Sequence, residues 1–252
     1  MANYILADYK RVISRIPRIV FLVIYEAVFA FIVLSKWSKA AGNYNSVALL
    51  GDSDLFFSLW FTLIVCLVDF VHSFSYDFSA KTIQVALGIG ISRPQMILSK
   101  LIQTTLVILT DMLVTFGVFG ILCAVTGCSL AGHQILYVLY NGLGAVVLGS
   151  LSVCLVMPLV FRTQNMVMSM VGCFTLLVDI PNMILRWATR LGPVFLARLE
   201  MDRYTHGNCV SVIVTNATTG NFQLWPYIGV IAWYAIGIYL TWLFFRKMEL
   251  DF

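Results

Sequence analysis

Six runs of mostly apolar residues follow one another along the 252-residue chain, and each is close to the roughly 20 residues that a helix needs to cross a bilayer. Hydrophobic residues make up 60% of the chain and charged residues only 11%, against about 25% in an ordinary soluble domain. Because a soluble domain cannot hide so much apolar surface, the composition argues against a soluble enzyme, a disordered chain and a nucleic-acid binder.

No run alternates with a period of two residues, as the strands of a membrane barrel do. We therefore expect an all-α integral membrane protein with one transmembrane domain over residues 1–252. The first run is short and contains Glu26. The six expected spans are roughly Ile19–Leu34, Leu55–Tyr76, Ile97–Val125, Ile135–Phe161, Met166–Leu185 and Pro226–Phe245.

The Lys and Arg residues between the runs predict the orientation, because cytoplasmic loops carry an excess of them. One set of segments holds ten: Lys10, Arg11, Arg15, Arg18, Lys81, Arg93, Lys100, Arg162, Arg246 and Lys247. The opposite set holds six: Lys36, Lys39, Arg186, Arg190, Arg198 and Arg203. Both termini are therefore predicted to face the cytoplasm. The net charge of +4 reflects these residues near the membrane ends rather than an acidic partner.

Residues 2–17 have the pattern of an amphipathic helix that lies in the inner headgroup layer. The alternative is a basic lead that only sets topology. Pro17 is expected to break this helix before the first span. Apolar residues at helical spacing form one stripe: Ile5, Tyr9, Val12, Ile13 and Ile16. The expected polar side holds Asp8, Lys10, Arg11, Ser14, Arg15 and Arg18.

The cytoplasmic segment 77–93 is too apolar for a free loop. A short helix is expected there, followed by a glycine hinge at Gly88 or Gly90. Ser92 and Gln95 then give the signature of a new helix start, with Pro94 in its first turn. The apolar side of the short helix must lie on the membrane or against a protein.

This segment resembles the corresponding stretch of small type-2 ABC exporter permeases. The matching residues are Ala80-Lys81-Thr82-Ile83, Leu87, Ile91-Ser92-Arg93 and Lys100. The family's glutamate at the start of the segment is replaced here by Tyr76 or Asp77, and its glycine by Ala80 or Lys81. The chain also resembles the family in layout, with six spans, an amphipathic N-terminal helix and a long extracellular segment, residues 186–224, before the last span.

The resemblance implies a bacterial plasma-membrane permease subunit that pairs with a second permease copy or a paralogue. It implies a coupling helix that docks on separate ABC ATPase subunits, with ATP and Mg²⁺ bound there and no cofactor on this chain. The chain has no G-x-x-x-x-G-K-[ST] motif for cradling phosphates. The subgroup that it resembles exports amphipathic peptides or other hydrophobic compounds. The residues assigned to ATPase coupling are Thr82, Ile83, Leu87, Ser92 and Arg93.

Four polar residues lie within the predicted spans, where a charge costs at least a few kcal/mol and needs a partner or a function. They are Glu26, Asp69, His72 and Asp111. No Lys or Arg is expected at their depth. One interpretation makes them a translocation path that contacts basic groups of a peptide; the other makes them structural, as protonated acids or interhelical hydrogen bonds. They show no tight metal-ligand motif, so no metal site is expected.

Two other function classes stay open at this point. The same four residues would carry the chemistry of an intramembrane enzyme, although we expect a permease subunit without catalytic residues. A membrane protein that only sequesters a peptide, for immunity or assembly, is the third alternative.

Three further features of the sequence predict local structure: a helix break, two outer cysteines and a face of small residues. Asp179 is expected to cap a helix broken at Pro181 or to meet Arg186. Cys128 and Cys209 both fall outside the membrane on this topology, where they either pair or stay free. Small residues on one face of the fourth span predict close helix packing; they are Gly142, Ala145 and Gly149.

Overall fold

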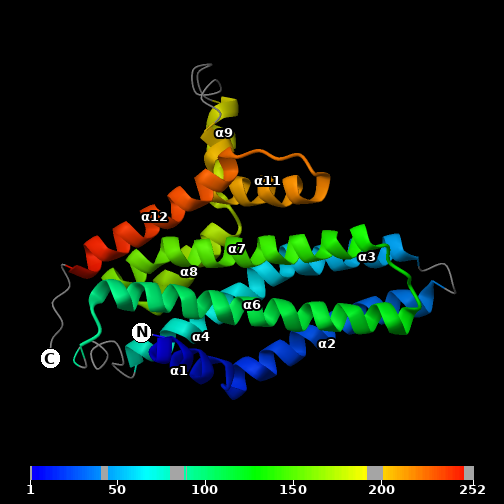
Figure 1. Cartoon of the computed structure of the whole chain (residues 1–252), viewed down its shortest axis with the longest axis horizontal. Helices are drawn as coiled ribbons and strands as arrows, with labels where there is room; N and C mark the ends of the chain where they lie inside the picture. Colours follow the sequence, from blue (N-terminus) through cyan, green and yellow to red (C-terminus); the bar gives the residue numbers. More distant parts are fainter. Residues whose placement is uncertain (1, 41–44, 80–87, 89, 192–200, 247–252) are drawn as a thin grey trace.

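The computed structural model describes residues 2–40, 45–79, 88, 90–191 and 201–246, and every regular element in these residues is helical (Figure 1). The all-α prediction is therefore confirmed. The α-helices are α1 (Ala2–Ile13), α2 (Ile16–Lys39), α3 (Ser46–Asp54), α4 (Cys66–Ser79), α6 (Arg93–Thr126), α7 (Gly132–Thr163), α8 (Met166–Leu177), α9 (Ile180–Leu191), α11 (His206–Thr219) and α12 (Trp225–Arg246). A π-helix, η1 (Leu55–Val65), joins α3 to α4, and a short 3₁₀-helix, η2 (Met201–Tyr204), precedes α11.

In the described residues, five helical segments are long and apolar enough to cross a membrane, and a sixth is added if a bent pair counts as one span. The protein is thus a multi-pass helical membrane protein. The five segments are Ile16–Lys39, Ser46–Ser75, Arg93–Thr126, Gly132–Thr163 and Trp225–Arg246, and they correspond to five of the six predicted runs.

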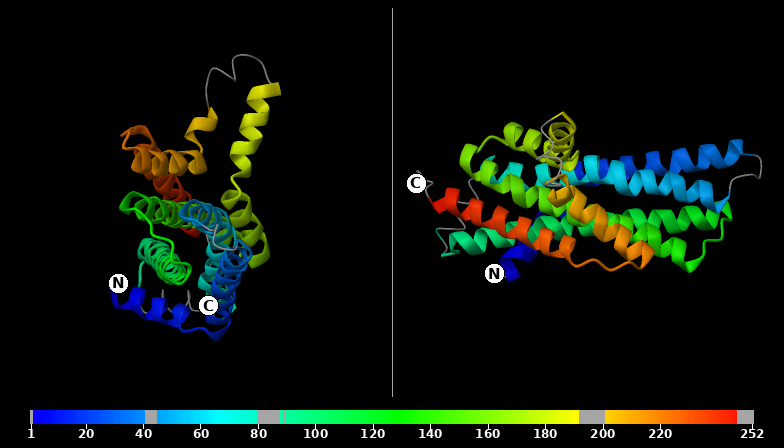
Figure 2. Two further views of the ribbon diagram at one scale, coloured as in Figure 1. Left: turned by 90° about the vertical axis from the view of Figure 1, so that its right-hand side faces the viewer. Right: turned by 90° about the horizontal axis from the view of Figure 1, so that it is seen from above.

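The run Met166–Leu185, predicted as one span, is a pair of helices, α8 and α9, bent by 57° at residues 178–179. Asp179 has a positive φ of 57°, and its carbonyl accepts the first amide bonds of α9, from Asn182 at 3.0 Å and Met183 at 3.2 Å. Pro181 has no N–H to continue the α8 ladder. Asp179 thus precedes α9 as expected, but its side chain accepts from the Asn182 side-chain amide at 2.9 Å rather than from a backbone amide. The helix α9 points away from the bundle (Figures 1 and 2).

The N-terminal amphipathic segment is shorter than predicted. The helix α1 ends at Ile13, the turn falls at Ser14 and Arg15, and Pro17 lies in the first turn of α2 instead of breaking the first helix. Proline suits this place because a first-turn amide has no intrahelical acceptor.

The helix α1 packs along α6 through polar contacts as well as apolar ones. The Asp8 carboxylate, expected on the water-facing side, is 6% exposed and pairs with the fully buried Lys100 at 2.5 Å. The hydroxyls of Tyr9 and Thr110 are hydrogen-bonded at 2.7 Å. Leu6, on the other side of α1, is 52% exposed. Val12 of the apolar stripe is therefore buried in the protein, whereas Leu6, outside the stripe, faces the surroundings.

The helix α7 forms the centre of the bundle. In its most apolar stretch 72% of the residues are buried, against 17% in α2 and 22% in α12. Its small residues form the predicted packing seam. A Cβ on Gly142 would lie 2.6 Å from Met112 Cε of α6, and a Cβ on Gly149 would lie 2.6 Å from Cys66 Sγ of α4. A side chain at either glycine would push the helices apart, so the prediction is confirmed.

Three arginines gather at one end of the bundle, which we call the basic end: Arg93, Arg162 and Arg246. Arg93 Nη1 donates to the carbonyls of Phe245 and Arg246, both at 2.7 Å, which ties the start of α6 to the last turn of α12. The guanidinium carbon Cζ of Arg162 lies 5.2 Å from the ring centroid of Phe244. The helix α1 lies in the same half of the bundle as this end of α12 (Figure 1).

The two outer cysteines do not pair. Cys128 packs against the main core beside α6, whereas Cys209 is buried in a separate cluster between α7, α11 and α12. Neither forms a disulfide in the structure. The segment 186–224, expected outside the membrane and similar to an outer hairpin of short helices in the exporter permeases, contributes α11, which lies along α7 (Figure 2).

We predict that Asp8→Asn lowers the free energy of unfolding by about 3 kcal/mol, because it removes the carboxylate that balances a buried ammonium group. Asp52→Asn is the matched control, since Asp52 pairs with Lys36, whose side chain is 56% exposed, and such pairs contribute about 0–1 kcal/mol. The measurement is denaturant unfolding in detergent micelles followed by tryptophan fluorescence. Equal losses in the two variants would contradict the buried-pair interpretation.

A candidate functional site of buried charges

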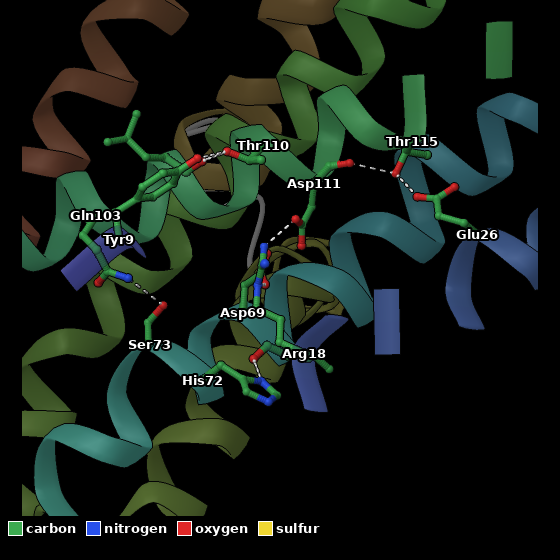
Figure 3. A network of polar contacts seen from close by, with 12 residues as sticks. Tyr9, Arg18, Glu26, Asp69, His72, Ser73, Gln103, Thr110, Asp111 and Thr115 are labelled. Carbon is green, nitrogen blue, oxygen red and sulfur yellow. Dashed lines mark hydrogen bonds and ion pairs between the residues drawn. The ribbon is translucent and has the colours of Figure 1, made fainter. Parts of the chain in front are cut away.

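Three charged side chains from three helices meet inside the bundle (Figure 3). The guanidinium of Arg18, in the first turn of α2, donates from Nε to Asp69 Oδ1 of α4 at 2.9 Å. It also donates from Nη2 to Asp111 Oδ1 of α6. All three residues are at most 3% exposed. The planar guanidinium presents several donors in fixed directions, which lets one side chain bridge two carboxylates.

This cluster corrects two expectations. Arg18 was expected on the polar side of the N-terminal helix, and no cation was expected at the depth of Asp69 and Asp111. The turn at Ser14 and Arg15 starts a new helix before Arg18, so its side chain points into the bundle. The signal in the sequence was the pair of buried acids, which required a counter-charge.

The cluster carries one more acid than base, because a single guanidinium faces two carboxylates. The second oxygen of Asp69, Oδ2, is buried and has no hydrogen-bond partner in the structure. A lone buried carboxylate oxygen is costly unless it is protonated or paired. The cluster therefore has the capacity to hold one further proton or one cationic group.

Glu26 lies near the cluster but is attached to it through a hydroxyl (Figure 3). Thr115 Oγ1 lies 2.6 Å from Glu26 Oε1 and 3.0 Å from the carbonyl of Asp111. A hydroxyl has one proton, so it donates to only one of these oxygens at a time. Glu26 Oε2 is a second buried carboxylate oxygen without a partner. The hydrogen bond to Thr115 fits a structural role for Glu26, and the unpartnered Oε2 fits a role in binding a proton or a ligand group.

His72 is not joined to the acids. Its Nδ1 bonds the carbonyl of Val68 one turn earlier in α4, at 2.9 Å. Because a carbonyl only accepts, Nδ1 carries the proton in this contact. Three of the four predicted path residues, Glu26, Asp69 and Asp111, are therefore brought together, whereas His72 stays half-buried beside them.

The residues predicted for ATPase coupling divide into two groups. Thr82, Ile83 and Leu87 lie outside the residues that the structure describes. Ser92 and Arg93 are described, and both organise the start of α6. The amide of Ser92 donates to Gln95 Oε1 at 3.1 Å, and Arg93 binds the end of α12. Within segment 77–93, α4 extends to Ser79, so the connecting stretch is shorter than predicted.

No group of three or more His, Cys, Asp or Glu side chains that could hold a metal ion occurs among the described residues. No protein-family model matches the chain, and no curated protein matches it either. The site must therefore be interpreted from its own geometry.

We predict that Arg18→Met destabilises the protein by about 3–5 kcal/mol, because it strands two buried acids. Asp69→Asn should lower the free energy of unfolding by a smaller amount, because the charge of Arg18 is then balanced by the one remaining carboxylate, Asp111. Arg18→Lys should fall between them, because an ammonium keeps the charge and loses the planar bridge. Unfolding in detergent gives the order, and a smaller loss for Arg18→Met than for Asp69→Asn would contradict the proposed charge balance.

Proposed function

We propose that this protein is the transmembrane subunit of an ATP-driven exporter, with a second permease copy or a paralogue beside it. ATP and Mg²⁺ are bound and hydrolysed on separate ABC ATPase subunits, and the chain itself is not an enzyme. The plasma membrane of a bacterium is the proposed location, with the basic end in the cytoplasm. The resemblance of segment 77–93 to type-2 exporter permeases motivates this proposal.

The observation that carries the proposal is the position of the connection between α4 and α6. This connection enters α6 at Arg93, which is bonded to the last turn of α12. A partner that docks on the connection would therefore act directly on α6, the helix that carries Asp111 and Thr115 of the buried site. Such a link is what coupling between ATP hydrolysis and a membrane path requires.

The proposed cargo is an amphipathic peptide or another hydrophobic compound. The excess of acid around Arg18 suits a basic group of the cargo, since a neutralised pair costs less at membrane depth than either charge alone. The exposed side of α2 is apolar, with Ile16 at 74% and Phe31 at 71% exposure. A cargo that partitions into the inner leaflet beside α1 would meet this surface first.

An intramembrane enzyme is not proposed, because no observation favours it. His72, the natural acid–base group of such a site, bonds Val68 instead of Asp69 or Asp111. A protein that only sequesters a peptide differs from the exporter in needing no ATPase, which the following experiment tests.

We predict that Ile83→Asp abolishes MgATP hydrolysis in the tagged protein purified with its partners, while Ile83→Val retains it. A charge on the apolar side of the connecting segment should disrupt docking, whereas valine keeps the surface apolar. Unfolding midpoints in detergent should be equal in the two variants. Normal co-purified ATPase activity in Ile83→Asp would contradict the coupling role, and no activity in the unmodified complex would favour sequestration.

We predict that Glu26→Gln changes the response to cargo without removing basal ATP hydrolysis, because glutamine keeps the shape and the bond to Thr115. The measurement is ATPase activity of the reconstituted complex with cationic amphipathic peptides, lipids and hydrophobic drugs. Thr175→Val, at a half-buried position of α8 outside the charged cluster, is the control. If peptides stimulate Glu26→Gln and the unmodified complex equally, Glu26 has no role in the path.

A further inference from the structure

A second polar site lies away from the buried charges, between η1, α7 and α11. A cavity of about 260 Å³ opens there, and its hydrogen-bonding side chains come from all three helices. They are Ser58, Thr62, Tyr137, Asn141, Ser211, Thr215 and Thr218. Among the residues that the structure describes, no charged side chain lines the cavity. The helix α11 reaches α7 here because Gly144 has no side chain: a Cβ on it would overlap Val214.

Thr62 is the unusual residue of this cavity. It is 3% exposed, and its hydroxyl has no hydrogen-bond partner in the structure. The other threonines with described side chains inside the described helices donate to the carbonyl four residues earlier, as Thr104 does to Lys100 at 2.9 Å. Thr62 lies in the π-helix η1, a type of helix that is often found at functional sites. A buried hydroxyl without a partner, in a residue that lines a cavity, points to a ligand that the hydroxyl reaches when the side chain rotates.

Three of the other hydroxyls of the cavity donate their protons within the protein. Ser58 donates to the carbonyl of Asp54 at 2.6 Å, and Thr215 to that of Ser211 at 2.9 Å. Thr218 donates to backbone carbonyls of its own helix in the same way. Each of these oxygens keeps lone pairs that accept. The cavity therefore offers these acceptors, while the hydroxyls of Thr62 and Ser211 and the second N–H of Asn141 Nδ2 add groups that can donate as well.

We propose that this cavity binds an uncharged, hydroxyl-rich group about the size of one sugar ring. Hydroxyls of the ligand donate to the lone pairs of the cavity, and one of them accepts from Thr62. A charged ligand is disfavoured, because no side chain of the lining compensates for its lost hydration. The volume lies below the roughly 300–1,000 Å³ of pockets for drug-sized ligands. Either a free sugar or the headgroup of a neutral glycolipid supplies this chemistry. The proposal does not rest on the exporter assignment.

The test measures binding to the full chain in phosphatidylcholine nanodiscs, prepared without sugar-headed detergents, by isothermal titration calorimetry. The probes are glucose, a single-chain alkyl glucoside, and the charged analogues glucosamine and gluconate. We expect a neutral probe to bind and both charged analogues to bind more weakly. Binding of the glucoside alone identifies a lipid headgroup, and binding of glucose as well identifies a free solute. Absence of binding by both neutral probes would overturn the proposal, leaving water as the occupant.

Thr62→Val is the decisive variant, because valine keeps the shape and removes the hydroxyl. Affinity for the neutral probe should fall about tenfold, while the thermal unfolding midpoint of the ligand-free protein should stay equal or rise. Thr104→Val, the same change at a buried threonine outside the cavity, should leave binding unchanged. Unchanged affinity in Thr62→Val, or a lowered midpoint for it, would overturn the proposal.

A steric pair of variants gives an independent check. Thr215→Leu places a larger side chain at the lining of the cavity, and Thr219→Leu makes the same change one turn further along α11, outside it. Both threonines are exposed and both bond the carbonyl four residues earlier. Binding should be lost only in Thr215→Leu, and equal binding in the two variants would contradict the location of the site.

Discussion

The guanidinium of Arg18 lies between Asp69 and Asp111, and this shared contact places α2, α4 and α6 relative to one another. A charge at membrane depth is tolerated only beside a partner, so the three helices cannot separate without stranding a buried ion. The contact also explains the N-terminus: the chain must turn at Ser14 and Arg15 to send Arg18 inward. The pair of Asp8 and Lys100 then holds α1 on α6 by the same physics.

Close packing around α7 is the second constraint, and it acts through residues that have almost no side chain. Helix association in membranes depends on such close approaches, because lipid offers no hydrophobic gain between helices. Gly142 and Gly149 admit side chains of α6 and α4, and Gly144 admits Val214 of α11. The last contact also shapes the hydroxyl-lined cavity between η1, α7 and α11. Packing and the proposed sugar-binding site thus depend on one helix.

The two polar sites differ in kind. The cluster around Arg18 is charged and has an excess of acid, which suits a proton or a cationic group of a cargo. The cavity at Thr62 is lined, in the described part of the chain, by uncharged side chains that accept and donate hydrogen bonds, which suits an uncharged hydroxyl-rich group. Both lie against helices of the same bundle, and Arg93 links the basic end of that bundle to α6. A partner acting on the connection between α4 and α6 would therefore have a mechanical route to the charged cluster.

The sequence by itself determined the all-helical membrane class, five of the spans, the seam on α7 and the break of the helix before Pro181. These follow from local properties: the length of apolar runs, the spacing of glycines and the missing N–H of Pro181. Asp69 and Asp111 were also recognisable as buried acids. Only the tertiary structure decided that Arg18 is the partner of these acids and that Asp8 is buried. It also decided that the Thr62 hydroxyl has no hydrogen-bond partner. Those facts depend on which residues far apart in the chain come together, and helical periodicity carries no information about that.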